Sequence, residues 1–443
     1  MDLKISKSSN FEPFNLPSDL LLGSATASLQ IEGGDIHNNW YKFCEAGKIK
    51  DKTHCKMADD HWNRYEEDIK LMKNLNHDIY RMSLEWARIE PERGKFCEDA
   101  LSHYRREIQM LIDNSIKPLV TIHHFSNPIW FEDIGGWANP DSVELFKDYT
   151  QKVVTYLGDI VTEWITINEP NVYLLETYIT ADFPPGKPSL SNFFKGLKNM
   201  AKAHIECYKL IHRIRKDMGC SGKTTVGVAN HIRVFDVYHN SLAARIPRDL
   251  ADFCFHTLFT ESMVNGRFLF PIGSGGYPYG KGRYSDFFGI NYYSRDIIKF
   301  SWNPGMMFAD LKVAENAEVN DLGWEIYPYG LYRVCRKYWS IYKLPIYITE
   351  NGICDSKDEK RTKFIYDHLK MIKKLADENV DVKRYYHWSL LDNFEWEKGL
   401  TPRFGLIEVD YKTQKRTIRK SGHFFAEVSK NKAVTADMIK RYF

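Results

Sequence analysis

Residues 117–169 hold two short apolar runs, KPLVTIHHF (117–125) and EWITINE (163–169), on either side of the segment DSVELFKDYTQKVVTYLG (141–158). Both runs are rich in β-branched and aromatic residues, as buried parallel strands are. In the segment between them, apolar residues recur at helical spacing: Val143, Phe146, Val153 and Leu157. The order strand–helix–strand predicts two parallel strands joined by a crossover helix.

The ends of this helix also have candidate signals. Asp141 and Glu144 have the spacing of a capping box, which would close the amino-terminal end of the helix. Gly158 follows the last apolar position and predicts the carboxyl-terminal stop.

The same alternation extends over the whole chain. Strand-like runs are separated by longer amphipathic stretches, and they occupy Leu20–Gln30, His77–Trp86, Lys117–Phe125, Glu163–Glu169, Thr225–Ile232, Phe287–Ser294, Pro345–Glu350 and Val382–Leu390. Eight such units predict an α/β protein with a single (β/α)8 barrel over residues 1–443, in which residues 1–16 form a loosely ordered amino-terminal segment. An open, doubly wound sheet is the alternative, and it is disfavoured because no Gly-rich phosphate turn follows an early strand.

Composition excludes several classes of protein. With 61 basic and 58 acidic residues and a net charge of +3, the chain has no electrostatic footprint for nucleic acid. No run of 18 apolar residues predicts a membrane span, and Met1–Ser18 lacks the apolar core of a signal peptide. The eight cysteines are scattered without a C-x-x-C pair, which favours free thiols in a reducing compartment. We therefore expect a cytoplasmic protein.

Polar residues gather at the ends of the predicted strands. In a (β/α)8 barrel these ends meet at one mouth, where active sites form. The residues concerned are Gln30, Glu32, Arg81, Glu85, His123, His124, Asn168, Glu169, Asn291, Tyr293, Glu350, Asn351, Trp388, Glu395 and Trp396. Polar side chains gathered in this way would be partly desolvated without a ligand, which is unfavourable. The cluster therefore favours a binding site for a polar molecule.

Two of these residues are carboxylates that end the fourth and seventh runs, Glu169 and Glu350. Cleavage of a glycosidic bond needs such a pair, one protonated acid for the leaving oxygen and one ionised partner for the anomeric carbon. The alternative is that either glutamate is a structural ion-pair partner.

The segments TINEP (166–170) and ITENG (348–352) resemble the two signatures of glycoside hydrolase family 1, the β-glucosidase and β-galactosidase family. The resemblance covers nearly the whole chain, from SATA (24–27) to WSLLDNFEW (388–396). It implies a retaining β-glycosidase that hydrolyses small β-glycosides or oligosaccharides by double displacement. It implies no metal and no cofactor.

The resemblance also implies roles for individual residues. Glu169 matches the acid/base and Glu350 the nucleophile, which Arg81 and Tyr293 would support; the positive charge of Arg81 would keep Glu350 ionised. The sugar-binding residues implied are Gln30, His124, Asn168, Asn291, Tyr293, Trp324, Trp388, Glu395 and Trp396. Within that set Asn168 matches the partner of the 2-hydroxyl and Trp324 lies on the leaving-group side. His123 points to the opposite face of its strand from His124, so we expect it behind the site.

Some positions depart from the family pattern. Phe125, Ser126 and Asn127 replace the usual residues after His124, and Asn171 stands where a large residue is common. These changes concern the preference for the leaving group.

Two other functions are weighed against a β-glycosidase. A 6-phospho-β-glycosidase is disfavoured because Glu395 would repel a 6-phosphate. A carbohydrate-binding relative without catalysis is disfavoured because both carboxylates are present. The choice among glucose, galactose, fucose and mannose stays open.

Overall fold

The computed structural model describes residues 11–303 and 308–443. Within them, eight parallel strands close a barrel in the order β2–β3–β4–β5–β6–β8–β11–β12, with β12 paired back to β2. These strands are β2 (Leu21–Ala25), β3 (Ile79–Ser83), β4 (Lys117–His123), β5 (Glu163–Asn168), β6 (Thr225–His231), β8 (Phe288–Asn291), β11 (Ile346–Gly352) and β12 (Val382–Trp388). The predicted (β/α)8 barrel is confirmed.

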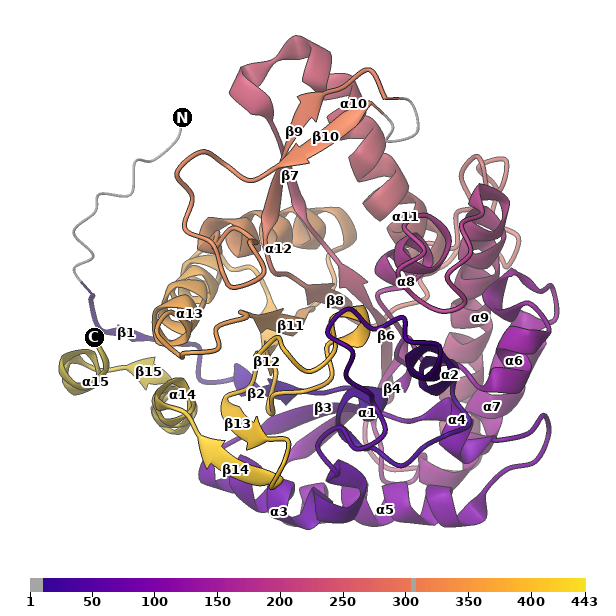
Figure 1. Cartoon of the computed structure of the whole chain (residues 1–443), viewed down its shortest axis with the longest axis horizontal. Helices are drawn as coiled ribbons and strands as arrows, with labels where there is room; N and C mark the ends of the chain where they lie inside the picture. Colours follow the sequence, from indigo (N-terminus) through magenta and orange to yellow (C-terminus); the bar gives the residue numbers. More distant parts are fainter. Residues whose placement is uncertain (1–10, 304–307) are drawn as a thin grey trace.

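Long helices surround the strands, and Figure 1 shows them as an outer ring. They are α3 (His61–Asn74), α5 (Glu98–Asp113), α7 (Ser142–Leu157), α9 (Leu190–Asp217), α12 (Pro328–Tyr342), α13 (Arg361–Asp377) and α14 (Lys420–Asn431). Shorter helices are α1 (Ser28–Ile31), α2 (Asn39–Glu45), α4 (Trp86–Ile89), α6 (Ile129–Asp133), α8 (Pro170–Tyr178), α11 (Leu258–Val264) and α15 (Ala436–Tyr442), with single turns at Gly136–Ala138, Tyr238–Asn240, Phe253–Thr257 and Trp396–Lys398.

Each predicted run contains one barrel strand, but the first and second runs are too long. The first strand stops at Ala25, and the chain turns into α1, so Gln30 lies on a short helix instead of a strand end. The second stops at Ser83 and is followed by α4, which begins at Trp86. Apolar content alone cannot separate a strand from a buried single turn of helix that follows it.

The predicted capping box at α7 is wrong, whereas the predicted stop is right. Asp141 occupies the N-cap position with helical backbone angles, and its side chain makes no capping hydrogen bond. A capping side chain needs an extended backbone at that position to reach back to the first amides. Gly158 is the C-cap residue, and a Cβ atom there would lie 2.4 Å from the Val154 carbonyl oxygen.

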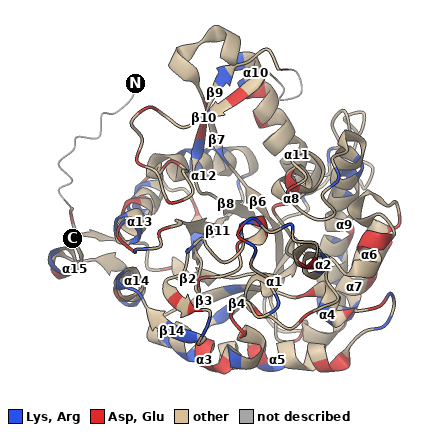
Figure 2. Cartoon of the chain, viewed as in Figure 1, with Lys and Arg blue, Asp and Glu red and all other residues tan. Residues whose placement is uncertain are grey.

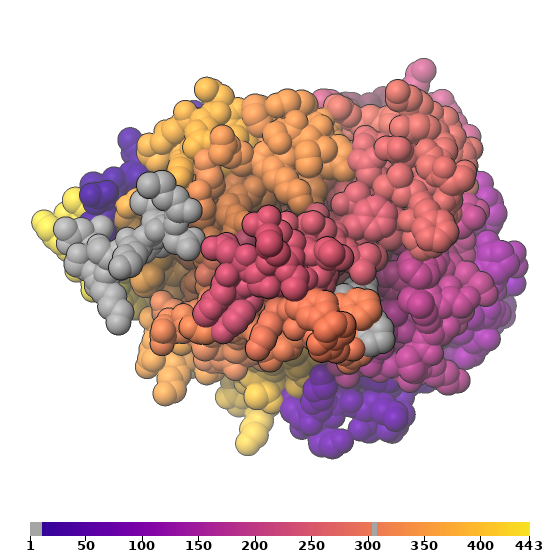
Figure 3. Space-filling view, turned by 90° about the horizontal axis from the view of Figure 1, so that it is seen from above, coloured from indigo at the N-terminus to yellow at the C-terminus, as the bar shows by residue number. Residues whose placement is uncertain are grey.

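A small sheet stands on the mouth side of the barrel. It is made of β7 (Val234–Val237), β9 (Arg295–Phe300) and β10 (Ala309–Lys312), and α10 (Leu242–Asp252) packs beside it. Figure 1 shows this unit at the top of the molecule, and Figure 3 shows α10 and the β9–β10 hairpin side by side when the molecule is seen from above.

The ends of the described chain lie together. β1 (Phe14–Asn15) pairs with β15 (Ala433–Val434) in an antiparallel ladder. The expected loosely ordered segment, residues 1–16, falls partly outside the described residues, because residues 1–10 are not among them. A further hairpin, β13 (Ile407–Asp410) with β14 (Lys415–Ile418), follows the last barrel strand.

Charged residues of both signs are interspersed over the outer helices (Figure 2), in keeping with the small net charge. Among residues 11–303 and 308–443, no helix is both long enough and apolar enough to cross a membrane.

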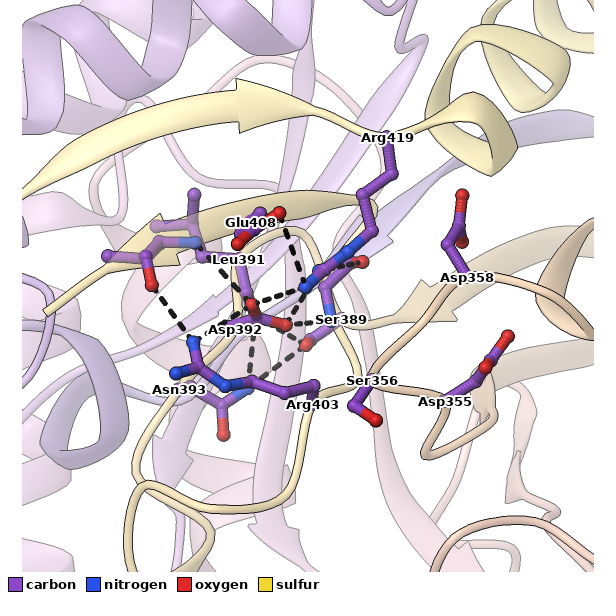
Figure 4. A network of polar contacts seen from close by, with 12 residues as sticks. Asp355, Ser356, Asp358, Ser389, Leu391, Asp392, Asn393, Arg403, Glu408 and Arg419 are labelled. Atoms are coloured by element: carbon purple, nitrogen blue, oxygen red, sulfur yellow. Dashed lines mark hydrogen bonds and ion pairs between the residues drawn. The ribbon is translucent and has the colours of Figure 1, made fainter.

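A buried charge network fixes the loop that follows β12. Asp392 is fully buried, and both of its oxygens accept hydrogen bonds from Arg419, at 2.8 Å each. Arg403 donates to the same carboxylate at 3.1 Å and the Gly405 amide at 3.0 Å. Figure 4 shows these contacts converging on Asp392. Because Trp388 and Glu395 lie on either side of Asp392 in the chain, the network positions both of them.

The Asp392 network gives a stability prediction. In Asp392→Asn the shape is kept, but the buried Arg419 loses its countercharge. We expect the free energy of unfolding to fall by about 3–5 kcal/mol, because removing one partner leaves an uncompensated buried charge. Urea denaturation of the folded protein measures the change.

Glu408→Gln is the matched control. Its carboxylate lies 4.0 Å from Arg419 and its side chain is 58% exposed, so its removal should change stability by less than about 0.5 kcal/mol. Equal effects of the two substitutions would show that Asp392 does not hold the loop.

Candidate active site

A pocket opens at the mouth where the barrel strands end. Most of the predicted site residues line it: His124, Asn168, Glu169, Tyr293, Trp324, Glu350, Trp388, Glu395 and Trp396. Gln30, Arg81 and Asn291 lie behind that lining and reach it through hydrogen bonds to Glu395, Glu350 and Glu169, respectively. The fold thus brings all twelve predicted residues, dispersed in the sequence, to one place.

Glu350 is held on both carboxylate oxygens. Arg81 Nη1 donates to Oε1 at 2.5 Å, and the Tyr293 hydroxyl donates to Oε2 at 2.5 Å. The carboxylate sits on β11, just where the register against β8 shifts after Ile348. Irregular pairing of this kind re-aims a side chain at the end of a strand. Two charge-assisted hydrogen bonds fix the orientation of the Glu350 carboxylate in the pocket.

Arg81 ties four barrel strands together. It is fully buried on β3 and donates to Glu350 and Thr349 on β11, to Asn168 on β5 at 2.6 Å, and to Thr121 on β4 at 3.2 Å. A guanidinium carries five donors in a fixed plane, so its position determines where these partners lie.

The protonation of Glu350 reflects two opposing effects. Burial raises the pKa of its carboxyl, while the Arg81 guanidinium and the Tyr293 hydroxyl lower it; the neighbouring Glu169 adds to the rise. The expectation that the charge of Arg81 keeps Glu350 ionised left out the effect of burial. Burial is the largest of these effects, and the pKa of the Glu350 carboxyl is raised to about 8. Of the two carboxyls, only Glu350 is bonded by Arg81 and Tyr293, so the positive charge and the hydroxyl donor of the pocket both face Glu350.

Glu169 is held on one oxygen. The Asn291 amide donates to Oε1 at 2.8 Å, and His231 Nδ1 lies 2.8 Å from the same atom. Oε2 has no hydrogen-bond partner among the described residues, so it is available to a ligand.

The backbone at Glu169 is strained. Its φ is 40°, in the left-handed region, and it forms the junction between β5 and α8. Its amide donates to the Ala229 carbonyl at 2.7 Å, and Pro170 starts the helix. A non-glycine residue in this region costs about 1–3 kcal/mol and persists where the surroundings determine it, often at functional sites.

His231 is a site residue that the sequence analysis missed. It lines the pocket, contacts Glu169 and stacks on the ring of Tyr293 at 5.9 Å between ring centres. A signal was present, since His231 lies near the end of the predicted run Thr225–Ile232. The rule that found the other strand-end residues would have found it too.

His124 and Gln30 each have a buried polar atom without a hydrogen-bond partner among the described residues. Asn168 Nδ2 donates to His124 Nε2 at 3.0 Å, so His124 carries its hydrogen on Nδ1. Burial and the nearby Arg81 hold the pKa of His124 well below its usual value, so the ring is neutral. His124 Nδ1 and Gln30 Oε1 are buried and have no partner within the described residues. Buried polar atoms are usually satisfied, and sugar hydroxyls could satisfy both.

His123 lies behind the pocket, as its place on the strand predicts. Its Nε2 is 2.9 Å from Asn127 Oδ1, and the Trp137 indole lies 3.3 Å from the same nitrogen.

Aromatic rings form the apolar part of the pocket. Trp388 and Trp396 lie 6.0 and 5.9 Å from the His124 ring, and Trp324 lies 5.9 Å from that of Tyr293. Both Trp388 and Trp396 are buried but border the pocket, so each offers part of an indole face. The C–H faces of a sugar pack well on such rings.

The four positions that depart from the family pattern have different roles. Phe125 lines the pocket. Ser126 instead donates to Glu85 at 2.7 Å, and Asn127 donates to Tyr173 and Glu132. Asn171 donates to the His231 carbonyl at 2.8 Å. Of the four, therefore, only Phe125 among the described pocket residues can contact a ligand directly.

Glu395 is another carboxyl that lines the pocket, besides Glu169 and Glu350. Gln30 Nε2 donates to its Oε2 at 3.3 Å, and burial raises the pKa of its carboxyl to about 7. Lys398 opposes that rise. Glu395 therefore changes its charge close to neutral pH.

Comparison with known proteins agrees with this geometry. The family model described as Glycosyl hydrolase family 1 matches residues 13–269 and 281–434. Beta-glucosidase A of Thermotoga maritima is 33% identical over 94% of this chain and 98% of its own length. Beta-glucosidase A of Acetivibrio thermocellus is also 33% identical, over 94% of this chain and 98% of its own.

Solved structures share the whole fold. A beta-glycosidase from Pyrococcus horikoshii superposes with a TM-score of 0.88 at 36% identity, covering 97% of this chain and 98% of its own. The beta-glucosidase from Thermotoga maritima in complex with glucoimidazole gives 0.86 at 30% identity, covering 94% of this chain and 99% of its own.

The raised pKa of Glu395 gives a pH prediction. If ionised Glu395 accepts hydrogen bonds from sugar hydroxyls, affinity for a neutral sugar such as glucose should weaken as the pH falls below about 7, because a protonated carboxyl is a poorer acceptor. In Glu395→Gln, affinity at pH 8 should drop by about tenfold or more, since a hydrogen bond to a charged group is worth about 1.5–3 kcal/mol. Calorimetric titration at pH 5–8 measures both.

The ratio of wild-type to Glu395→Gln affinity isolates this group from other titrations. That ratio should shrink toward one at pH 5. A ratio that stays constant from pH 5 to pH 8 would mean that Glu395 does not bind the sugar.

Proposed function

The chain belongs to glycosyl hydrolase family 1 and is a glycoside hydrolase of the β-glucosidase type, and on this premise we propose that it is a retaining β-glycosidase. It would remove the non-reducing terminal β-linked sugar from small β-glycosides or oligosaccharides, on a single catalytic (β/α)8 domain. The observation that carries the proposal is the pair of carboxyls in one pocket, with Glu350 held by Arg81 and Tyr293 and with Glu169 held by Asn291 and His231.

The first step breaks the glycosidic bond. Glu350 attacks the anomeric carbon while Glu169 gives its proton to the leaving oxygen, so the aglycone departs as a neutral alcohol. Arg81 and Tyr293 keep the attacking carboxylate oriented. The product of this step is a covalent glycosyl ester on Glu350.

The second step releases the sugar. Once Glu350 is esterified, Glu169 is left as a carboxylate, and it removes a proton from the water that attacks the anomeric carbon. The bond to Glu350 breaks, and both carboxyls return to their starting states. Two inversions give net retention at the anomeric carbon. Glu169 carries out both proton transfers and Glu350 supplies the nucleophile, so the proposed mechanism calls for no metal or cofactor.

The sugar itself would be held by the polar groups around Glu350. Asn168 accepts from Arg81 and would bind the 2-hydroxyl, while Gln30, His124 and Glu395 would bind the others. Trp388 would form the floor, with Asn291 holding Glu169 and Trp396 closing one side. The related Thermotoga maritima enzyme is described in complex with glucoimidazole, a fact that supports a site for a glucose-like ring here.

Free sugars are favoured over 6-phosphorylated ones. Glu395 lines the pocket and would repel a 6-phosphate. Lys398 also lines the pocket, but it is paired with Glu397, so its charge is already compensated. We therefore propose unphosphorylated β-glycosides, with a 6-phospho-β-glycosidase as the alternative and a non-catalytic carbohydrate-binding protein as the less favoured one.

We also propose a cytoplasmic location. All eight cysteines lie within the described residues and are free thiols, which suits a reducing compartment.

The two carboxylates can be separated by substitution. Glu350→Ala removes the covalent step, so activity should fall by about 10⁴-fold or more on every substrate. Glu169→Ala should spare glycosylation by dinitrophenyl glycosides, because their leaving group needs little protonation. The glycosyl-enzyme should then accumulate, and added azide should release a β-glycosyl azide, since azide needs no general base. Product analysis and mass spectrometry measure the outcome.

Mass spectrometry should find the trapped sugar attached to Glu350. A sugar attached to Glu169, or rescue of the Glu350→Ala variant by azide to a β-product, would reverse the two roles.

The substrate class has its own test. Nitrophenyl β-glucoside and β-galactoside, each with and without a 6-phosphate, should show turnover of the free glycosides without added metal or nucleotide. Turnover of the phosphorylated forms alone would show that the argument from Glu395 is wrong.

A further inference from the structure

Two buried thiols lie beside the active-site rim. Cys44 is on α2 and Cys55 is in the loop that follows, and their sulfur atoms are 3.7 Å apart. Neither residue takes part in the proposed reaction.

His54 completes a group of three candidate ligands. A ring nitrogen of His54 and the two sulfurs all lie within 4.8 Å of one another. We propose that Cys44, His54 and Cys55 form a binding site for a thiophilic divalent ion of the Zn²⁺ class, with water in the fourth position.

The spacing of the sulfurs fits such an ion. Zinc–sulfur bonds are about 2.3 Å long and zinc is tetrahedral, so two thiolates on one ion lie about 3.7–3.8 Å apart. A disulfide would bring the same atoms to about 2.05 Å. The observed 3.7 Å matches the edge of a tetrahedral site.

The surroundings of His54 fit a metal ligand. Its Nε2 lies 3.0 Å from Glu45 Oε1, so the Nε2–H can be donated to that carboxylate. This leaves the lone pair on Nδ1, which here accepts the Lys56 amide at 3.0 Å. A bound ion would replace that amide, and Lys56 is exposed, so water can satisfy the amide. A carboxylate that holds the second nitrogen is the usual companion of a metal-bound histidine.

The site is accessible to an ion from one side. The two cysteines are 8% and 4% exposed, whereas the His54 side chain is 29% exposed. Softer divalent ions prefer such a sulfur-rich set, and Mg²⁺ and Ca²⁺, which prefer oxygen, do not.

The ion would fasten α2 to a loop that supports the pocket. In this loop the Lys50 amide donates to the Glu397 carbonyl at 2.8 Å, and Thr53 Oγ1 accepts the Leu400 amide at 3.0 Å. From the helix side, Trp40 packs against Trp396 at 5.1 Å. Metal binding would therefore stabilise the rim that carries Glu395 and Trp396 without touching the catalytic carboxylates.

Spectroscopy of the whole protein tests the proposal. Protein kept reduced and freed of metal by chelation is titrated with Co²⁺. One equivalent should produce thiolate-to-metal charge-transfer absorption, and Cys44→Ser and Cys55→Ser should each abolish it. His54→Gln should weaken binding by about tenfold or more. Cys97→Ser, a partly exposed cysteine outside the group, is the matched control and should bind as wild type does.

Zn²⁺ provides a second readout. At a hundredfold excess over Kd it should raise the Tm of the wild type and of Cys97→Ser by about 3 °C, and it should not raise the Tm of Cys44→Ser or Cys55→Ser.

Several results would overturn the proposal. They are a wild type without a charge-transfer band, a band that survives either cysteine substitution, or unchanged affinity in His54→Gln. Formation of a Cys44–Cys55 disulfide in the absence of reductant, together with no metal uptake by the reduced protein, would assign the thiols to redox chemistry instead.

Discussion

The pairing of Arg81 with Glu350 is the interaction on which the rest of the site depends. A fully buried guanidinium and a buried carboxylate are stable only together, because either one alone would carry a heavy desolvation penalty. The barrel provides the place for both, one on β3 and one on β11. The remaining donors of Arg81 then determine where Asn168 and Thr121 lie. One buried charge therefore sets the geometry of Glu350, the proposed nucleophile, and of Asn168, the residue beside the proposed acid/base.

The pairing of Arg81 with Glu350 also gives the two pocket carboxyls different surroundings. Of the two carboxyls, Arg81 and Tyr293 bond only to that of Glu350, whereas Glu169 is held by Asn291 and His231 on one oxygen. The surroundings thus differ between the two carboxyls, with a guanidinium and a hydroxyl beside Glu350 and an amide and an imidazole beside Glu169, although both sit in one pocket. Glycosidic cleavage by double displacement needs this asymmetry at the start of the reaction.

Much of the fold and most of the site were predictable from the sequence. Strands buried on both faces, such as Glu163–Asn168, are rich in apolar and β-branched residues. In the helices between the strands, apolar residues recur every three to four positions. Strand-end residues such as Glu169 and Glu350 follow from the same pattern, since the ends of parallel strands meet at one mouth.

Other features depend on tertiary contacts that a sequence does not display. Gln30 reaches the pocket from α1 because its amide bonds to Asn393 and Phe394, far along the chain. The capping box at Asp141 failed because the backbone there is already helical. Asn171 turned out to hold the backbone of His231, so its substitution for a larger residue acts through the scaffold. Burial also raises the pKa of the Glu350 carboxyl, and the sequence pattern does not show how deeply this side chain is buried.

The configuration of the first sugar released tests the central claim most directly. Proton NMR in D₂O can follow a nitrophenyl β-glucoside during the first minutes of hydrolysis, before mutarotation mixes the anomers. Double displacement through Glu350 predicts that β-glucose appears first and α-glucose follows slowly. Initial release of α-glucose would mean a single displacement by water and would contradict the role given to Glu350.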